Sequence, residues 1–412
     1  MNAMILGKGQ YYSLDTYKTK LNNNVLVTGA SGSGKTRNLV TPNLLLATGS
    51  YIVSDPKGSL YDAYGPYLKS KGYTVKKLDF TDPANSCRYN FFRYIHNSTD
   101  IMKIAHMLIY QDHSGNRNLD PFWDESAQLL VQSILSYLKE EKLYGEQNLQ
   151  GMMKVLRTCQ ISEDTLDYMC PLDIIMDNLE KKNKNSEAVK LYRMIRCSAD
   201  KTFRSILITI FAKLGVFDTP ELRKMMKRDD TDFHSIGSQK TAFFVVVSDT
   251  DRSMDPLADL FFSQAMNELC LYADKECGGR LPVPVRFFLD DFATNCRIAD
   301  FPRMIASIRS REISVMLMIQ AESQLEESYD KDAKTIIGNC DTYVYLGCND
   351  VDTAKSIADR CDIPVKKVLY MPLGSCLIFR RGQTPITCEL FNLENMLRQK
   401  GLLPQKTESR AI

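Results

Sequence analysis

Long hydrophobic runs are missing from this sequence of 412 residues. The longest apolar runs are Ala242–Val247 and Val315–Ile319. Both are far below the roughly 18 residues that a membrane-spanning helix needs. The sequence therefore predicts a chain that does not cross a bilayer by itself.

Metal-binding and disulfide patterns are also missing. The four histidines show no H-E-x-x-H or other ligand spacing, so a zinc or iron site has little support. The twelve cysteines are scattered from Cys87 to Cys388 without a C-x-x-C pair, and no signal peptide precedes them. We therefore expect reduced, buried thiols in a cytoplasmic protein.

The charge balance shows no excess of either sign. Lys and Arg number 52 against 50 Asp and Glu, with 44% hydrophobic and 25% charged residues. These values are typical of globular proteins and exclude wholesale disorder, collagen and a coiled coil. Any contact with nucleic acid must come from local patches, of which Lys224–Arg228 is the densest, although it fits a solvated helix end equally well.

Short apolar runs that end in small or acidic residues recur in two zones of the chain, as buried parallel strands do. Segments long enough for crossover helices separate them, which predicts a doubly wound, mainly parallel α/β fold. A terminal hairpin is expected from two further runs around a Gly382 turn. The expected strands are Val25–Thr28, Tyr51–Ser54, Tyr73–Leu78, Ala242–Ser248, Val285–Leu289, Ile313–Ile319, Thr342–Gly347, Ser375–Arg380 and Ile386–Leu390.

Helical periodicity replaces this pattern between the two zones. Apolar residues recur at three- and four-residue spacing in Ser126–Leu138 and Ser205–Leu214, with a charged break at Lys181–Ser186. We therefore expect an all-α domain inserted into a nucleotide-binding domain. The expected boundaries are 1–98 and 233–395 for the two parts of the nucleotide-binding domain, 99–232 for the insertion, and 396–412 for a polar tail that frays after Asn395.

A phosphate-binding loop carries the strongest signal in the chain. The segment Gly29–Thr36 fits G-x-x-x-x-G-K-[ST] and directly follows an apolar strand. Glycines let backbone N–H groups surround the phosphates, Lys35 reaches the β- and γ-oxygens, and the Thr36 hydroxyl binds Mg²⁺. The expected nucleotide-binding residues are Gly29, Ala30, Ser31, Gly32, Ser33, Gly34, Lys35, Thr36 and Arg37.

Two adjacent acids end the strand Val285–Leu289. A P-loop needs a carboxylate on a neighbouring strand for its metal, and Asp290 is the candidate, with Asp291 positioned to activate the attacking water. Gln320 ends another core strand, where an amide can sense the γ-phosphate. Each acid could instead cap a helix or lie in a loop, and Gln320 could be an ordinary surface residue. Ser54–Asp55 and Ser248–Asp249 are alternative strand-end acids without an adjacent pair.

Further motifs follow one another along nearly the whole chain: Thr41–Leu45, Ser54–Gly58, Leu289–Ala293, Gln320–Leu325 and Gly338–Thr342. Together with the P-loop, they resemble the type IV secretion coupling proteins, the TraG-like conjugation ATPases. The resemblance implies a RecA-like motor using ATP and Mg²⁺ with an inserted all-α domain. It also implies a homo-hexamer at the cytoplasmic mouth of a secretion channel, moving single-stranded DNA with its relaxase.

The sequence departs from that family at three points. Family members usually begin with a transmembrane region, so we expect either an excised cytosolic portion or a member that reaches the inner face of the membrane through partners. Ser59 stands where the family often has Glu, and Asp291 replaces the usual catalytic Glu, which puts the hydrolysis rate in question.

Hexameric motors complete each site with an arginine from the next subunit. Arg309 and Arg311 are the candidates, although two arginines at a helix end could equally complement its dipole.

Other functions remain open from the sequence. One is a related hexameric motor that pumps chromosomal or phage DNA. Another is a nucleotide-dependent scaffold that docks cargo through the helical domain and scarcely hydrolyses ATP. The presence of Asp291 in place of the usual Glu supports this alternative. A GTPase is disfavoured because no N-K-x-D motif occurs. A small-molecule kinase is disfavoured by the long stretch between Lys35 and Asp290.

Overall fold

A computed structural model describes residues 2–110, 120–159, 170–292, 294 and 296–403. The chain divides into two compact units. Unit 1 comprises Met1–Val75, His234–Phe244 and Leu269–Ile412, and unit 2 comprises Lys76–Phe233 and Val245–Glu268. The boundary runs through strands β5 (Thr74–Asp79) and β6 (Thr241–Val246) and through helices α11 (Phe233–Ser238) and α12 (Asp255–Glu276).

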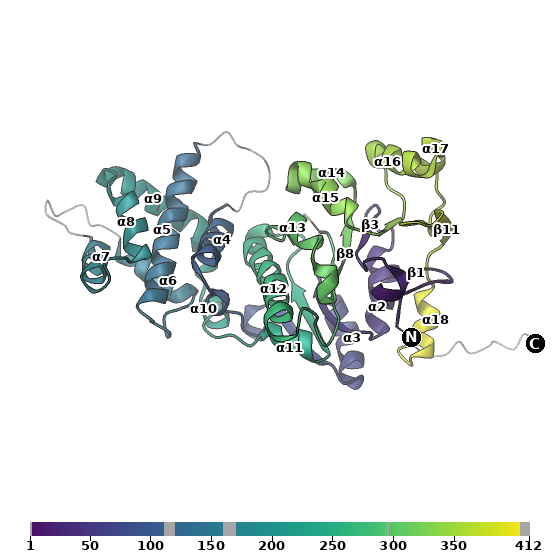
Figure 1. The fold of residues 1–412 in the computed structure, drawn as a ribbon, viewed down its shortest axis with the longest axis horizontal. Coiled ribbons are helices and arrows are strands. Elements are labelled where there is room, and N and C mark those ends of the chain that lie inside the picture. Colours follow the sequence, from purple (N-terminus) through teal and green to yellow (C-terminus); the bar gives the residue numbers. More distant parts are fainter. Residues whose placement is uncertain (1, 111–119, 160–169, 293, 295, 404–412) are drawn as a thin grey trace, which may run out of the picture. The chain divides into compact units, whose positions relative to one another are not determined.

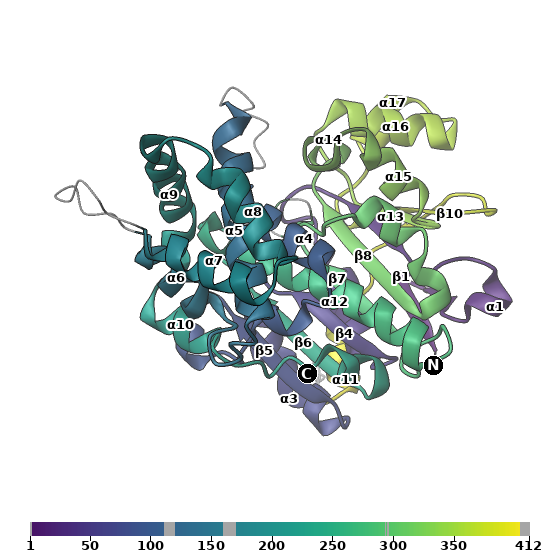
Figure 2. The same ribbon diagram turned by 60° about the vertical axis from the view of Figure 1, so that its left-hand side comes forward.

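A mainly parallel sheet organises unit 1. In the described part of the chain it has nine strands in the order β11-β10-β9-β3-β8-β7-β4-β6-β5. Figure 2 shows β8, β7 and β4 side by side, and their pairings are parallel. The predicted α/β fold class is confirmed. The strands not yet given are β3 (Val25–Thr28), β4 (Ser50–Ser54), β7 (Val285–Leu289), β8 (Ile313–Ile319), β9 (Thr342–Tyr345), β10 (Ser375–Arg380) and β11 (Ile386–Glu389).

The strand register decides where the functional loops meet. Val25 pairs with Met316 and Thr28 with Ile319, while Leu289 pairs with Leu317 on the other side of β8. Because β3, β7 and β8 run parallel, their carboxyl ends lie at one edge of the sheet. The predicted phosphate loop, the pair Asp290–Asp291 and Gln320 directly follow the carboxyl ends of β3, β7 and β8 respectively. The expected strands are confirmed to within a few residues because continuous apolar runs are what a doubly covered sheet buries.

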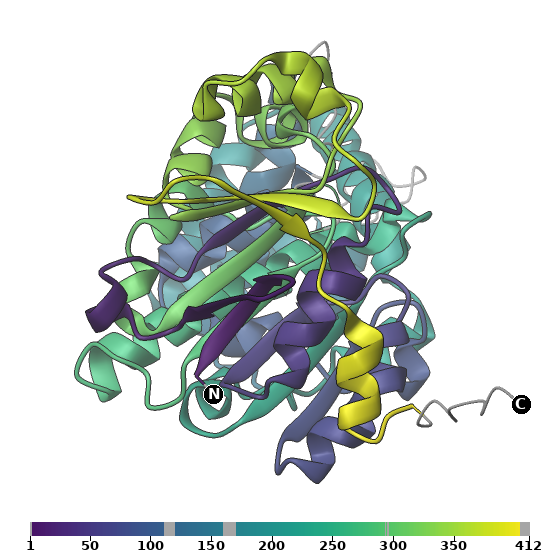
Figure 3. The ribbon, with the colours of Figure 1, turned by 90° about the vertical axis from the view of Figure 1, so that its right-hand side faces the viewer.

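A hairpin at the start of the chain was not predicted. Strands β1 (Ala3–Gly7) and β2 (Gln10–Ser13) form a separate antiparallel sheet. The C-terminal hairpin β10–β11 is antiparallel, as predicted. The prediction of fraying after Asn395 is wrong for the next residues, because helix α18 (Leu393–Gln399) continues through them and lies against α2 (Thr41–Leu45) (Figure 3). The predicted tail from residue 404 onward lies outside the described residues.

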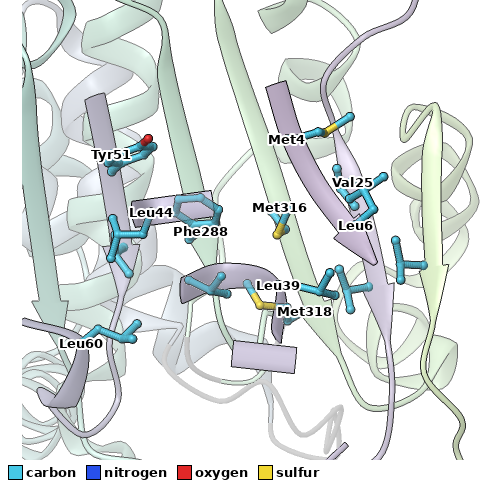
Figure 4. Packing of buried hydrophobic residues seen from close by; sticks show 14 of the residues in the cluster. Met4, Leu6, Val25, Leu39, Leu44, Tyr51, Leu60, Phe288, Met316 and Met318 are labelled. Carbon is cyan, nitrogen blue, oxygen red and sulfur yellow. The ribbon is translucent and has the colours of Figure 1, made fainter. Parts of the chain in front are cut away.

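The core of unit 1 seats the helical segment that follows the phosphate loop. Leu39 and Leu44 are fully buried with Val27, Met316 and Met318 from the sheet (Figure 4). Burying such a side chain contributes about 1.5–3 kcal/mol each, so the segment is fixed against the sheet. The remaining helices of unit 1 are α1 (Thr16–Thr19), α3 (Ser59–Ser70), α13 (Phe301–Ile305), α14 (Glu322–Tyr329), α15 (Ala333–Gly338), α16 (Val351–Cys361) and α17 (Val365–Leu369).

Unit 2 contains the helices expected in the middle of the chain. At its centre, α5 packs against α8, α4 and α9 (Figure 1). The predicted break at Lys181–Ser186 separates α7 from α8, while the 99–232 domain boundary stays a prediction. The helices are α4 (Ser98–Ile109), α5 (Pro121–Glu140), α6 (Leu149–Thr158), α7 (Pro171–Lys182), α8 (Glu187–Arg196), α9 (Asp200–Leu214) and α10 (Pro220–Met225).

Local sequence explains where these helices begin. The Asn97 side chain accepts from the Asp100 backbone N–H, and the Asp100 carboxylate accepts from Asn97 in return, which forms a capping box ahead of α4. Asp120 caps α5, with Pro121 as its first residue. Among the helices in the described ranges, none is long and apolar enough to span a bilayer.

Candidate functional site

The phosphate loop is fastened between two strands of the sheet. The Gly29 N–H donates to the Ile319 carbonyl at 3.1 Å, and the Ala30 N–H donates to the Gly347 carbonyl at 2.9 Å. Gly32 and Gly34 have φ of 74° and 89°, values in the left-handed region that only glycine adopts without cost. The loop therefore begins from anchored ends and turns back through glycines, as the sequence predicts.

Close packing also requires glycine at the start of the loop. A Cβ added at Gly29 would lie 2.6 Å from Ser33 Oγ and 2.9 Å from Leu346 Cβ. Ser33 Oγ itself is buried and has no hydrogen-bond partner in the part of the chain that the structure describes. A buried hydroxyl without a partner is costly. Its orphaned donor suits a phosphate oxygen in the loop.

A proline explains the unusual helical turn after the loop. Residues Thr36–Val40 form a π-helical turn that continues into α2, and the Thr41 N–H donates to the Thr36 carbonyl. Pro42 has no N–H, and its ring clashes with the carbonyl four residues earlier in a regular helix. The wider turn accommodates this ring, so Thr36 lies at the first turn of a helical segment whose positive end faces the loop.

Lys35 lies inside the site rather than in solvent. Its side chain is buried, and Nζ donates to the carbonyls of Gly29 at 2.6 Å and Ala30 at 3.2 Å. Burial lowers the pKa of Lys35, an effect that the nearby charges of Asp291 and Asp290 oppose. The ammonium is thus held beside the loop by carbonyls and carboxylates of its own chain.

Thr36 and Asp290 join the two predicted motifs directly. The Thr36 hydroxyl donates a short hydrogen bond to Asp290 Oδ2. Burial raises the pKa of Asp290, and the neighbouring Asp291 charge adds to this, while the Thr36 bond and Lys35 oppose it. A hydroxyl and a carboxylate oxygen that already touch are the two protein ligands that a P-loop offers Mg²⁺.

Asp291 has an unusual backbone conformation. Its φ is 48°, in the left-handed region that Asp tolerates better than most residues. Its N–H donates to Asp290 Oδ1 at 3.2 Å, and the next residue, Phe292, donates its N–H to the Met318 carbonyl of β8 at 2.9 Å. The acid pair therefore lies at the carboxyl edge, between β7 and β8.

Asp55, the strongest alternative acid, binds backbone N–H groups of its own chain. It is 1% exposed, and its Oδ2 accepts the N–H groups of Leu60 and Tyr61 at 2.9 Å each. Gly58 enters α3 with φ of 66°. The Asp55 carboxylate thus holds the first turn of α3, which Ser59 begins. The other alternative acid, Asp249, is exposed.

Gln320 and Arg37 border the site with exposed side chains. Gln320 directly follows β8, and its backbone N–H donates to Gln324 Oε1 at 2.8 Å. Arg37 is paired with Glu394 of α18 at 3.2 Å. Gln320 thus lies at the carboxyl edge of the sheet, where the sequence predicts it, and Arg37 directly follows Thr36.

The two candidate arginines do not join this site within one chain. They lie in a short 3₁₀ turn, Ile308–Arg311, just before β8 begins, and therefore at the amino edge of the sheet. Arg311 forms a bidentate pair with Asp274 at 2.8 and 2.7 Å. Arg309 is exposed and donates to the Thr16 carbonyl at 3.2 Å.

Some contributions to the site come from residues that the motifs did not indicate. Gly347, with φ of 90°, supplies the carbonyl that holds Ala30. The Ser54 hydroxyl donates to the Asp290 carbonyl at 3.4 Å. The position of Ser54 at a strand end was the only available signal, since both contacts join residues more than 200 apart in sequence.

The residues present fit a nucleoside triphosphate with its magnesium ion. The loop has glycines in left-handed conformations, an orphaned buried hydroxyl and a buried lysine, and the touching Thr36–Asp290 pair supplies metal ligands. In the described ranges, no group of three or more His, Cys, Asp or Glu is arranged to hold a metal ion.

Comparison with solved structures identifies the fold. The bacterial conjugative coupling protein TrwBdeltaN70, in its unbound form, has a TM-score of 0.65 and 17% identity over 89% of this chain and 84% of that chain. TrwB in complex with ADP and Mg²⁺ has a TM-score of 0.62 and 18% identity over 89% and 85%. VirB4 of Thermoanaerobacter pseudethanolicus is more distant, at 0.52 and 12% over 95% and 96%. The predicted RecA-like fold is confirmed by these likenesses.

Comparison with known sequences identifies the family. Protein VirD4 of Rhizobium rhizogenes is 23% identical over 344 residues, 81% of this chain and 48% of that protein. VirD4 of Agrobacterium fabrum is 23% identical over 349 residues, 81% and 49%. The chain thus spans about half the length of these relatives. Residues 2–362 match the family described as Type IV secretory system Conjugative DNA transfer. The chain belongs to this family, and the predicted resemblance to type IV secretion coupling proteins is confirmed.

Proposed function

We propose that this chain is the motor portion of a conjugative coupling protein, which hydrolyses ATP to drive single-stranded DNA through a type IV secretion channel. The observation that carries the proposal is the direct contact between Thr36 and Asp290. It joins the phosphate loop to the acid strand in a chain of the conjugative DNA transfer family. Hydrolysis needs this second motif beside the loop, because the strand-end acid holds the metal ion against the phosphates.

ATP and Mg²⁺ are the proposed ligands. Support comes from the TrwB structures in complex with the ATP analogue ADPNP and with ADP and Mg²⁺. The amides of Gly29–Thr36 would surround the phosphates, while Thr36 and Asp290 would hold the metal. When bound, Mg²⁺ neutralises charge that develops on the phosphate oxygens. Arg37 would act at the rim of this site.

Asp291 is the proposed base for the attacking water. Its carboxylate lies beside Asp290 and close enough to influence Lys35 electrostatically. In this role it would orient the water and accept its proton, while Lys35 would stabilise charge on the phosphate oxygens. Gln320, at the next strand end, would sense the γ-phosphate and report its loss to α14.

An arginine from another copy is proposed to complete the site in a homo-hexamer. Arg309 and Arg311 lie at the opposite edge of their own sheet, so they can act only on the nucleotide of a neighbour. Arg311 is already engaged by two bonds to Asp274, whereas Arg309 has one bond to a backbone carbonyl. Arg309 is therefore the stronger candidate.

The cargo and the location are proposed by analogy with the family. We propose that the helices of unit 2 recruit a relaxase or another secretion substrate, and that the motor acts with channel proteins at the cytoplasmic face of the inner membrane. An anchor or partner proteins would hold it there. A folded, amphipathic helical group supports a docking role, since α6 and α8 each bury one apolar face and expose a charged one.

ATP turnover with and without single-stranded DNA tests the proposal most simply. We expect turnover that rises with DNA and is lost in Lys35→Ala, while Lys366→Ala, which removes an exposed lysine of α17, behaves as the parent. Mass determination of the same samples reports assembly. Turnover that ignores DNA would favour another cargo.

A scaffold with little hydrolysis is the second candidate, and Asp291 is the observation that favours it. Aspartate is one methylene shorter than the usual glutamate, and a misplacement of about 1 Å can cost ~100-fold in rate. In that case nucleotide binding would control docking of cargo to unit 2. Tight ATP binding with negligible turnover at every DNA concentration would support this candidate.

A further inference from the structure

Two cysteines face each other across the C-terminal hairpin. Cys376 of β10 and Cys388 of β11 are direct partners in the antiparallel register, and their sulfur atoms are 3.4 Å apart. Both thiols are free. Nothing in the proposed nucleotide chemistry uses them.

The hairpin geometry permits a bond between these sulfurs. Directly opposed residues in antiparallel strands have Cα atoms about 4.5 or 5.5 Å apart, depending on the type of pair. Both separations fall within the about 4.4–6.8 Å that disulfides span. Side-chain rotation alone can therefore bring the sulfurs from contact to bonding distance while the backbone stays in place.

Gly7 of β1 packs directly against the two sulfur atoms. A Cβ at Gly7 of β1 would lie 3.2 Å from Cys376 Sγ and closer still to Cys388 Sγ. Only glycine leaves room for both thiols at this point. The Lys8 N–H donates to the Glu389 carbonyl at 2.8 Å, which keeps the N-terminal hairpin against β11 beside the pair.

The two thiols differ in access. Cys376 is fully buried, and burial raises the pKa of its thiol. Cys388 is partly exposed. Because an oxidant reaches an accessible thiolate first, Cys388 is the sulfur that reacts first, and Cys376 is positioned to resolve the product.

We propose that Cys376 and Cys388 form a reversible dithiol site, which an oxidant of the peroxide class closes to a disulfide. Cys388 attacks the O–O bond, so that an S–O bond forms, the O–O bond breaks and water leaves with the thiol proton. Cys376 then attacks the sulfenic sulfur, forming the S–S bond and releasing a second water that carries its proton. With hydrogen peroxide as the oxidant, two thiols are oxidised to one disulfide and one H₂O₂ is reduced to two waters.

Mild oxidation of the purified full chain tests the site. We expect hydrogen peroxide, followed by alkylation of the remaining thiols, to give a peptide linking Cys376 to Cys388 that is two hydrogens lighter than its reduced parts. Dithiothreitol should restore both thiols. Phenylarsine oxide, which bridges two close thiols, should label this pair and block its closure.

Two variants keep the test decisive. In Cys376→Ser, Cys388 should remain a sulfenic acid or accept glutathione, because its resolving partner is gone. Cys361→Ser, which removes a partly exposed cysteine of α16, should leave closure unchanged. Overoxidation of Cys388 in the parent while Cys376 stays free, or equal alkylation of both before and after peroxide, would overturn the proposal. Neither result depends on nucleotide binding, so the proposed function is tested separately.

Discussion

The two edges of the sheet in unit 1 differ in what they hold. The carboxyl edge gathers the phosphate loop, Lys35, Thr36 and the acid pair within contact of one another. The amino edge holds Arg309 and Arg311, in bonds to their own chain. One chain thus brings together the groups proposed to bind phosphate and metal, while its candidate arginines lie at the other edge. The difference supports the proposal that another copy completes the site.

The largest effect on ATP binding and turnover should come from a substitution at the carboxyl edge. We expect Lys35→Ala to fold but to lose nucleotide binding and all turnover, because one buried ammonium is removed while β3 and the following helix remain. Calorimetric titration with ATP and Mg²⁺ measures the loss. Unchanged affinity would remove the basis of the nucleotide site.

The next largest effect should come from the amino edge. Removing an arginine that reaches a neighbour's phosphate costs ~10³-fold or more in turnover, so Arg309→Ala should lose this much while binding ATP normally. Arg311→Ala is the matched control, because it should lose only bonds within its own chain, to Asp274 and to the Ser307 carbonyl. An ion pair at this exposure is worth about 0–1 kcal/mol of stability. Steady-state ATPase assays on assembled protein compare the two. A larger loss in Arg311→Ala would reverse the assignment.

Asp291 separates a motor from a scaffold at the carboxyl edge. Asp291→Asn should reduce turnover by about 10²–10⁴-fold, the usual contribution of a general base, and spare ATP binding. Asp291→Glu should keep or raise turnover if the longer acid reaches the water, although the left-handed backbone at this residue disfavours Glu by ~1 kcal/mol. Single-turnover kinetics measure both. If Asp291→Asn hydrolyses ATP at the parent rate, the assignment is wrong.

Much of the carboxyl edge could be predicted from sequence because its signals are local. The strand, glycines, Lys35 and Thr36 lie within a dozen residues, and Asp290–Asp291 end a recognisable apolar run. The Gly347 carbonyl and the β1–β2 hairpin were missed because their roles depend on pairing between distant segments. Helix α18 was missed because its few apolar residues are buried only by tertiary packing against α2.

The smallest effect concerns the free energy of unfolding, which the buried carboxylate of Asp290 should lower. Since burial raises the pKa of Asp290, the folded state holds its proton to higher pH than the unfolded state. The folded protein without metal should therefore lose stability as pH rises from the ordinary Asp range through that raised value. Asp290→Asn should lack this loss and be about 1 kcal/mol more stable near neutral pH. Urea unfolding at several pH values checks this. Equal pH profiles for parent and variant would contradict it.

Mixing two inactive variants tests the incomplete site most directly. Lys35→Ala chains keep Arg309, and Arg309→Ala chains keep an intact phosphate loop, so a mixed assembly contains interfaces where one chain supplies what the other lacks. Our account predicts that equimolar mixing restores part of the ATP turnover that neither variant shows alone. Turnover that stays absent in mixtures shown by mass to contain both chains would contradict a site completed by the neighbour's Arg309.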